Sequence, residues 1–228
     1  MKLQPFDLDR IRASGLVREV EFHEEIGSTN DRAAERMCGG PLGCPFLVLA
    51  AKQTGGRGRG SNRWWSAPGA LTFSLVLDAE NVGLPTERWP QIALAAGAAV
   101  GEAIEQAISD ATVRLKWPND VYLAGKKTGG ILVEMPANAR GQLIVGIGVN
   151  VNNSLAGAPL ELGQIATSMT DEAKRTFDAT DMLLAILAHF SRWRTSLATD
   201  ERAVFARWRT RCLLTGKRVC LSAGSQQV

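Results

Sequence analysis

Residues 113–134 read VRLKWPNDVYLAGKKTGGILVE, and their pattern indicates how the sheet of this protein is built. Val113–Trp117 alternates apolar and polar side chains, which predicts a strand. Val121–Leu123 and Ile131–Glu134 lie on either side of a turn at Gly125 and predict a β-hairpin. Strands joined by such short connections pair antiparallel. The stretch therefore predicts an antiparallel meander.

Similar patterns extend in both directions along the chain. Strands are expected at Val20–Phe22, Phe46–Ala51, Leu71–Leu77, Leu143–Val151 and Lys217–Leu221. Helices are expected at Arg32–Met37, Ile92–Ile108, Asp181–Leu197 and Glu201–Cys212, with a long loop over Gln53–Gly69. Helices are interposed less often than a doubly wound fold requires. We therefore expect an α+β fold, in which helices pack on one face of a mixed, largely antiparallel sheet.

The composition is that of an ordinary globular protein. The chain has 228 residues, of which 45% are hydrophobic and 21% charged, which excludes a disordered chain or a disulfide-dense miniprotein. A net charge of +3 does not indicate nucleic-acid binding. Met1–Asp7 lacks the apolar core of a signal peptide, so we expect a cytoplasmic protein. None of the four cysteines forms a CxxC pair, so we expect no zinc site.

The loop Gln53–Ser66, QTGGRGRGSNRWWS, is the most informative segment for function. Alternating glycine and arginine leaves backbone N–H groups accessible beside guanidinium groups, and both bind phosphates and carboxylates. The GK[ST] ending of a Walker loop is absent. Trp64 and Trp65 add flat apolar surfaces. The alternatives are a solvated loop or an RGG-like nucleic-acid tail, and the tail is disfavoured because the loop lies between two strong strands.

Two further segments carry polar groups of the same kind. Lys127 lies beside Gly129 and Gly130, where it can reach an anionic ligand and offset charge that develops in a transition state. The alternative is a plain hairpin with an exposed lysine. Ser28–Asn30 lies at a predicted helix start, where its side chains would cap the helix or bind a polar ligand.

Five motifs together resemble one family. Gly27–Asn30, Gly56–Gly60 before Trp64, Lys116–Asp120, Lys127–Glu134 and Gly146–Asn150 occur in the order found in the biotin–protein ligases, also called holocarboxylase synthetases or biotin–[acetyl-CoA-carboxylase] ligases. The resemblance is strong from Val20 to Asn152 and weaker in the helices that follow. It implies a fold similar to that of the class II aminoacyl-tRNA synthetases and the biotin–lipoate ligases.

The resemblance also implies a two-step reaction. Biotin, the substrate, and ATP would give biotinyl-5′-AMP and pyrophosphate with Mg²⁺, and a specific lysine of a biotin carboxyl carrier protein, such as that of acetyl-CoA carboxylase, would then attack the adenylate. No metal ligand is assigned. Neither nucleic acid nor a membrane is expected as a partner, and a homodimer is left open.

Site residues follow from the same motifs. Three cations, Lys127, Arg57 and Arg59, would be catalytic, because they offset the repulsion between a carboxylate and a phosphate. The residues implied for biotin are Ser28, Thr29, Asn30, Gln53, Arg57, Gly58, Arg59 and Lys127. Those implied for ATP or the adenylate are Trp64, Lys116, Asn119, Asp120, Gly130 and Asn150.

The ends of the chain depart from the larger family members. Only 27 residues precede Ser28, so we expect a monofunctional ligase without an N-terminal DNA-binding domain. Residues 1–213 would form the catalytic domain, and residues 214–228 the start of a truncated or absent C-terminal β-barrel. The alternatives are a lipoate or octanoate ligase of the same superfamily and a non-catalytic form that only binds biotin or nucleotide. A repressor or RNA-binding role is disfavoured, because no basic stripe or recognition helix is evident.

Overall fold

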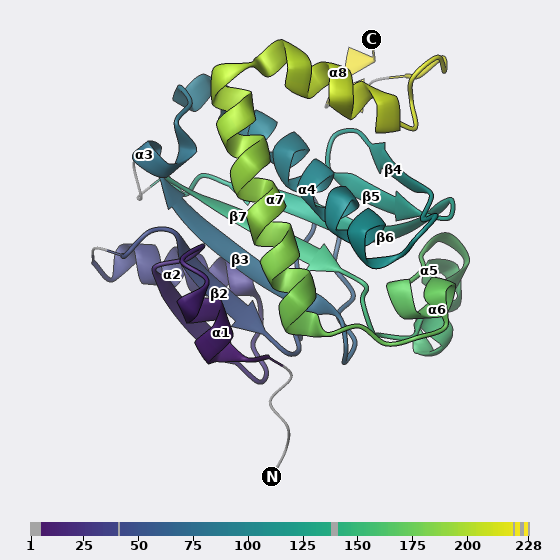
Figure 1. Ribbon diagram of the computed structural model, residues 1–228, viewed down its shortest axis with the longest axis horizontal. Helices are drawn as coiled ribbons and strands as arrows, with labels where there is room; N and C mark the ends of the chain where they lie inside the picture. Colours follow the sequence, from purple (N-terminus) through teal and green to yellow (C-terminus); the bar gives the residue numbers. More distant parts are fainter. Residues whose placement is uncertain (1–5, 41, 138–140, 221, 224–225, 228) are drawn as a thin grey trace.

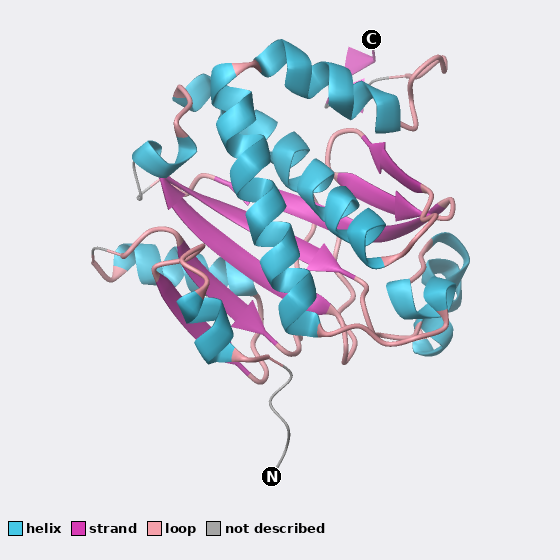
Figure 2. Cartoon of the chain, in the orientation of Figure 1, coloured by secondary structure: helices cyan, strands magenta, loops and turns pink. Residues whose placement is uncertain are grey.

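The computed structural model describes residues 6–40, 42–137, 141–220, 222–223 and 226–227. Within these residues, seven strands form one twisted sheet in the order β1-β2-β3-β7-β6-β5-β4 (Figures 1 and 2). Only β1 and β2 pair parallel, and the other neighbours are antiparallel. The predicted mixed, largely antiparallel sheet is therefore confirmed. The strands are β1 (Glu19–His23), β2 (Phe46–Ala50), β3 (Leu71–Asp78), β4 (Val113–Lys116), β5 (Asp120–Leu123), β6 (Lys126–Glu134) and β7 (Gln142–Val149).

Helices connect and cover these strands. The α-helices are α1 (Leu8–Ala13), α2 (Thr29–Cys38), α3 (Ala79–Val82), α4 (Ile92–Ala107), α5 (Leu160–Ile165), α6 (Met169–Ala173), α7 (Ala179–Thr199) and α8 (Glu201–Arg211). Two 3₁₀ helices are η1 (Thr86–Gln91) and η2 (Leu155–Gly157). The four helices expected from periodicity are present as α2, α4, α7 and α8. The others are too short to produce a repeat in the sequence.

The main core lies between one face of the sheet and the pair α4 and α7, which cross in front of the sheet in Figure 1. Alternate residues of β3 and β7, such as Phe73 and Val145, point into this core. Helix α4 approaches the sheet closely, because a Cβ at Gly101 would lie 3.2 Å from Val113 Cγ1. Burial of apolar side chains on this face is the main favourable contribution to folding.

Helix α2 packs on the opposite face of the sheet. The sequence predicted helices on one face only, so this helix is additional to that expectation. Its Ala33 and Met37 contact Phe46, Val48 and other residues in a second, smaller core. These strand residues alternate in sequence with those of the main core, because side chains along a strand point to opposite faces. The helices thus cover one face broadly and the other only in part, which leaves room for a cavity.

The C-terminal part differs from expectation. Lys217–Cys220 forms no strand, although Lys217–Leu221 was predicted as one; Leu221 lies outside the described residues. Two short strands, β8 (Ser222–Ala223) and β9 (Gln226–Gln227), pair beyond it. A stretch of only five residues without clear alternation is weak evidence for a strand. Among the described helices, none is both long and apolar enough to cross a membrane.

Candidate active site

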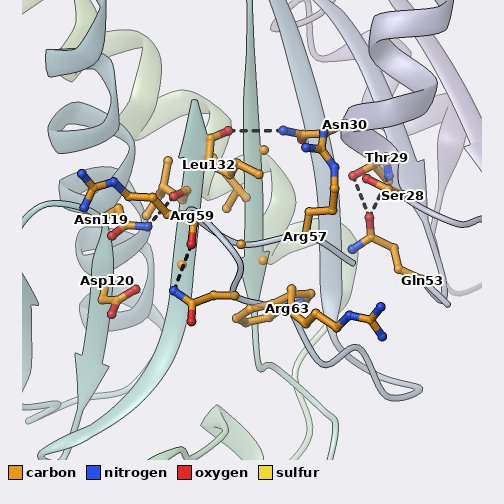
Figure 3. Close-up of a pocket in the computed structure, with 18 of the residues that line it drawn as sticks. Ser28, Thr29, Asn30, Gln53, Arg57, Arg59, Arg63, Asn119, Asp120 and Leu132 are labelled. Atoms are coloured by element: carbon orange, nitrogen blue, oxygen red, sulfur yellow. Dashed lines mark hydrogen bonds between the residues drawn. The ribbon is translucent and has the colours of Figure 1, made fainter. Parts of the chain in front are cut away.

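A cavity of about 310 Å³ lies where α2, the 53–66 loop and strands β5, β6 and β7 meet (Figure 3). Its lining is polar and cationic, with a few apolar side chains. It is lined by Ser28, Thr29, Asn30, Gln53, Arg57, Gly58, Arg59, Gly60, Asn62, Arg63, Trp64, Phe73, Asn119, Asp120, Lys127, Gly130, Ile131, Leu132, Gly146, Ile147 and Gly148. Segments far apart in the sequence thus converge on one small space.

The N-terminus of α2 supplies one wall. Ser28 is the N-cap residue, and its hydroxyl accepts a hydrogen bond from the backbone N–H of Asp31 at 3.3 Å. The cap predicted from the sequence is therefore present, and Ser28 also lines the cavity. The backbone N–H and the hydroxyl of Thr29 both donate to Gln53 Oε1, at 2.7 and 3.1 Å.

A chain of hydrogen bonds continues from Thr29 across the sheet. Ser74 Oγ lies 2.7 Å from Thr29 Oγ1 and 2.5 Å from Asn30 Oδ1. Asn30 Nδ2 donates to Glu134 Oε2 at 2.7 Å and to the Leu132 carbonyl at 3.4 Å. Since a carboxylate and a carbonyl only accept, Asn30 must direct its NH₂ to them and its Oδ1 to the opposite side.

Two glycines of β7 form the floor. A Cβ at Gly146 would lie 2.1 Å from Asn30 Oδ1, and a Cβ at Gly148 would lie 2.5 Å from the Trp64 ring. Both positions therefore require glycine as long as Asn30 and Trp64 keep their places. Trp64 Nε1 is buried without a hydrogen-bond partner among the described residues.

Arg57 is held by carboxylates. Its Nη1 and Nη2 donate to the two oxygens of Glu134 at 2.8 and 2.6 Å, and Nη2 also lies 2.8 Å from Asp31 Oδ1. The hydrogen bonds that Arg57 donates to Glu134 raise the pKa of Arg57 above its ordinary value. A bidentate pair of this kind fixes the direction of the guanidinium.

The opposite end of the cavity contains a lysine–carboxylate pair. Lys127 Nζ lies 2.6 Å from Asp120 Oδ1, and both side chains are mostly shielded from solvent. Gly130 lies opposite Asp120 on the neighbouring strand and leaves space beside both charged groups. Asn119 Nδ2 donates to the Ile131 carbonyl at 2.8 Å, which fixes the turn before β5.

Two arginines of the loop remain without such partners. Among the described residues, neither Arg59 nor Arg63 forms an ion pair with a carboxylate, unlike Arg57 and Lys127. Both line the cavity. The positive charge open to a ligand therefore comes mainly from these two side chains.

The structure gathers most of the predicted site. Ser28, Thr29, Asn30, Gln53, Arg57, Gly58, Arg59, Trp64, Asn119, Asp120, Lys127 and Gly130 all line the cavity. Lys116 and Asn150 do not: Lys116 is exposed on β4, and the Asn150 side chain bonds to the Thr167 carbonyl and to Asn153.

Sequence reasoning did not identify Arg63, Ser74 and Glu134 as site residues. Ser74 is a small polar residue that alternates with the apolar residues of a buried strand, and this signal could have indicated a position that bonds to the residues of the site. Glu134 ends a quoted motif, but nothing in its spacing shows that it contacts residues 77 and 104 positions away.

A cationic loop over a polar, glycine-floored cavity in a mixed sheet defines a site for a small ligand with an anionic group. The sequence profile described as the biotin/lipoate A/B protein ligase family matches residues 23–152. The chain belongs to this family.

Named relatives agree with the assignment to this family. The chain is 38% identical to the bifunctional ligase/repressor BirA of Bacillus subtilis over 75% of its own length and 52% of that protein. It is 33% identical to the biotin–[acetyl-CoA-carboxylase] ligase of Mycobacterium tuberculosis, over 89% of its length and 74% of that protein. The chain thus spans about half the length of the first relative and three quarters of the second.

Solved structures share the fold. The biotin protein ligase from Aquifex aeolicus, in complex with biotin and ATP, superimposes with a TM-score of 0.79. It is 30% identical to this chain, and the superposition covers 92% of this chain and 85% of that one. A biotin protein ligase from Leishmania major in complex with biotinyl-5-AMP gives a TM-score of 0.71 at 28% identity, and covers 92% of this chain and 87% of that one.

Proposed function

We propose that this chain joins biotin to ATP to form biotinyl-5′-AMP and then transfers biotin to a specific lysine of a biotin carboxyl carrier protein. The observation that carries the proposal is the cavity itself. One end presents fixed neutral hydrogen-bonding groups and the other presents cations, and the chain belongs to a family whose solved members include complexes with biotin and ATP.

The neutral end fits the ureido group of biotin. That group has one carbonyl acceptor and two N–H donors. Asn30 Oδ1, whose direction is set by Glu134, accepts from Ser74 and keeps a second lone pair, and Gln53, whose Oε1 is occupied by Thr29, retains its NH₂ as a donor. Because the directions of these donors and acceptors are fixed, they favour a ligand with a complementary arrangement of acceptors and donors. The Trp64 ring and the adjacent glycines give the apolar bicycle a flat surface.

The cationic end fits the reacting anions. A carboxylate oxygen of biotin attacks the α-phosphorus of ATP, the bond to the β-phosphate breaks, and pyrophosphate leaves. Two anions repel during this approach, so Lys127 and Arg59 would offset the charge that develops. Arg57, occupied by Glu134 and Asp31, would hold the loop in place.

The second step needs no nucleophile from this chain. The amine of the carrier lysine attacks the acyl carbon of the adenylate, the acyl–phosphate bond breaks, and AMP leaves with the electron pair. Until then the mixed anhydride must be kept from water. The loop residues that line the cavity between positions 57 and 63 would provide that cover.

Magnesium fits the site as an ion carried largely by the nucleotide. Asp120 is the one carboxylate residue among those that line the cavity, and the described residues contain no cluster of three metal-binding side chains. Mg²⁺ commonly binds through one or two carboxylates together with substrate phosphates and water. Asp120 would therefore contribute one ligand, and the ion would neutralise phosphate charge.

Several expectations from the sequence stay predictions. These are the division into a catalytic domain at residues 1–213 and the start of a β-barrel at 214–228, the roles of Lys116 and Asn150, a cytoplasmic location, a homodimer and the absence of nucleic-acid binding. The carrier of acetyl-CoA carboxylase is the partner that we propose, because two relatives are named for it.

The test is pyrophosphate release from ATP by the purified chain, with biotin or lipoate, and with or without an apo carrier domain. We expect release with biotin alone and labelling of the carrier lysine when the carrier is added. Release with lipoate instead would assign the chain to the other branch of the family. Biotin binding without release would indicate a non-catalytic binding form.

A further inference from the structure

We propose that Glu134, which does not line the cavity, is the residue that positions both the biotin pocket and the loop above it. Among the residues that the structure describes, its carboxylate is the one group that bonds to both Asn30 of α2 and Arg57 of the loop. The proposal rests on the proposed function for its effect on biotin, but not for its effect on the loop.

The hydrogen bonds described above form one continuous path. Gln53 bonds to Thr29, Thr29 to Ser74, Ser74 to Asn30, Asn30 to Glu134, and Glu134 to Arg57. Gln53 and Arg57 are the two ends of one five-residue segment of the loop. Both ends are therefore tied to a single path that passes through α2, β3 and β6.

Charge gives Glu134 a role that its neighbours in the path do not share. The other links join neutral groups, whereas Glu134 holds a guanidinium by two hydrogen bonds and an amide by a third. Bonds to a charged group are stronger and more directional than neutral ones. Its four lone-pair sites also allow it to accept all three at once.

The consequence is coupling between ligand recognition and loop position. Without the carboxylate, the Asn30 NH₂ loses its shorter hydrogen bond and keeps only the Leu132 carbonyl at 3.4 Å, so the direction of its Oδ1 is held less firmly. Arg57 loses its bidentate partner and keeps only Asp31, an exposed residue. We therefore infer that one substitution outside the cavity both weakens biotin binding and frees the loop.

The variant that tests this is Glu134→Gln, which keeps the shape and removes the charge. The matched control is Glu25→Gln, which removes the exposed Lys52–Glu25 ion pair near the loop but outside the path. Two quantities are measured: the rate of tryptic cleavage after Arg57, Arg59 and Arg63 in ligand-free protein, by mass spectrometry, and the biotin dissociation constant, by calorimetry.

We expect Glu134→Gln to increase loop cleavage about tenfold and to weaken biotin binding at least fivefold, with Glu25→Gln unchanged in both. Glu134→Asp, which retains the charge with a shorter reach, should restore part of each effect. If Glu134→Gln gave the cleavage rate and affinity of Glu25→Gln, the proposal would be wrong.

A double variant distinguishes a specific action of Glu134 on Arg57 from a general loss of order around the cavity. If Glu134 acts through Arg57, Arg57→Gln combined with Glu134→Gln should weaken biotin binding no more than the stronger single change. Effects that add would overturn the proposal. Should the wild-type chain not bind biotin at all, the proposed function fails, and the cleavage comparison in ligand-free protein alone decides whether Glu134 holds the loop.

Discussion

Gly148 shows how a missing side chain builds this site. The Trp64 ring occupies the place that a side chain at position 148 would take, with 2.5 Å between the ring and an ideal Cβ. Backbone atoms of a central strand cannot move away, because β7 is paired on both sides. The ring would have to move instead, and the floor of the cavity would change.

Gly148→Ala should therefore weaken biotin binding without changing any charge. We expect a loss of about tenfold or more, equivalent to about 1.4 kcal/mol, when the dissociation constant is measured by calorimetry. Gly157→Ala is the matched control, because no atom lies within 4 Å of its ideal Cβ. Equal affinity of Gly148→Ala and the wild type would show that the Trp64 position is irrelevant to the ligand.

Lys127 gives the second prediction at this scale. Its removal leaves Asp120 without its cation at the end of the cavity where the reacting anions would meet. Lys127→Ala should lower biotin-dependent pyrophosphate release by about 10²-fold or more, since preorganised charge is a large term in catalysis. Lys126→Ala, an exposed neighbour, is the control. Near-normal release by Lys127→Ala would exclude the catalytic role.

At the scale of elements, the sequence pattern predicted which segments form helices and strands better than it predicted how these elements pack. Strand β2 follows from a continuous apolar run that is buried on both faces. Strands β3 and β7 follow from their side-chain pattern, and helices α4 and α7 from helical spacing, because their residues face a core on fixed sides. The position of α2 on the opposite face did not follow, since its few apolar residues fit either face. The Lys217–Leu221 strand was wrong over its described residues, because five residues near the end of the chain carry no clear strand period and the sequence predicts no partner strand beside them.

The same contrast holds within the site. Residues that belong to continuous motifs, such as Arg59 and Asn119, were found because the motif lies in one stretch of sequence. The pairing of Arg57 with Glu134 and of Thr29 with Ser74 was not, because it depends on how β3 and β6 lie beside α2. Long-range register is a property of the folded sheet, and no local pattern encodes it.

The edge strand β1 and helix α2 are joined by an ion-pair cluster that predicts a pH dependence. Burial tends to raise the pKa of Glu21, but hydrogen bonds from Arg32 and His23 outweigh it and lower the pKa below the ordinary 4.5. The folded protein therefore holds Glu21 ionised at pH values where the unfolded chain already binds a proton. This contribution is complete above pH 4.5 and is lost as the pH falls through the lower, folded value.

Glu21→Gln should accordingly flatten the loss of stability on acidification below pH 4.5. The measurement is the free energy of unfolding from urea titrations at a series of pH values. Glu35→Gln serves as the control, because Glu35 pairs with the same Arg32 from a more exposed position. An acid limb that is as steep in Glu21→Gln as in Glu35→Gln would contradict the assignment.

At the scale of the whole molecule, the two faces of the sheet have different tasks. One face packs against α4 and α7 and contains the larger core, and the other carries the smaller core and the polar groups of the cavity. Alternation along β3 makes this division unavoidable: Phe73 and Leu75 enter the core, and Ser74 between them enters the hydrogen-bond path of the site.

The division predicts that stability and binding can be changed separately. Ile186 is fully buried on α7, in the larger core and away from the cavity. Ile186→Ala should lower the free energy of unfolding by about 2–5 kcal/mol, through lost burial and the space left behind. Biotin affinity, measured well below the melting temperature, should stay within about twofold of wild type, since Ile186 itself does not line the cavity. Gly148→Ala should show the opposite pattern, with affinity reduced more than stability. If biotin binding fell in step with stability in Ile186→Ala, the two faces would be one cooperative unit, and the cavity would depend on the helical layer for its shape.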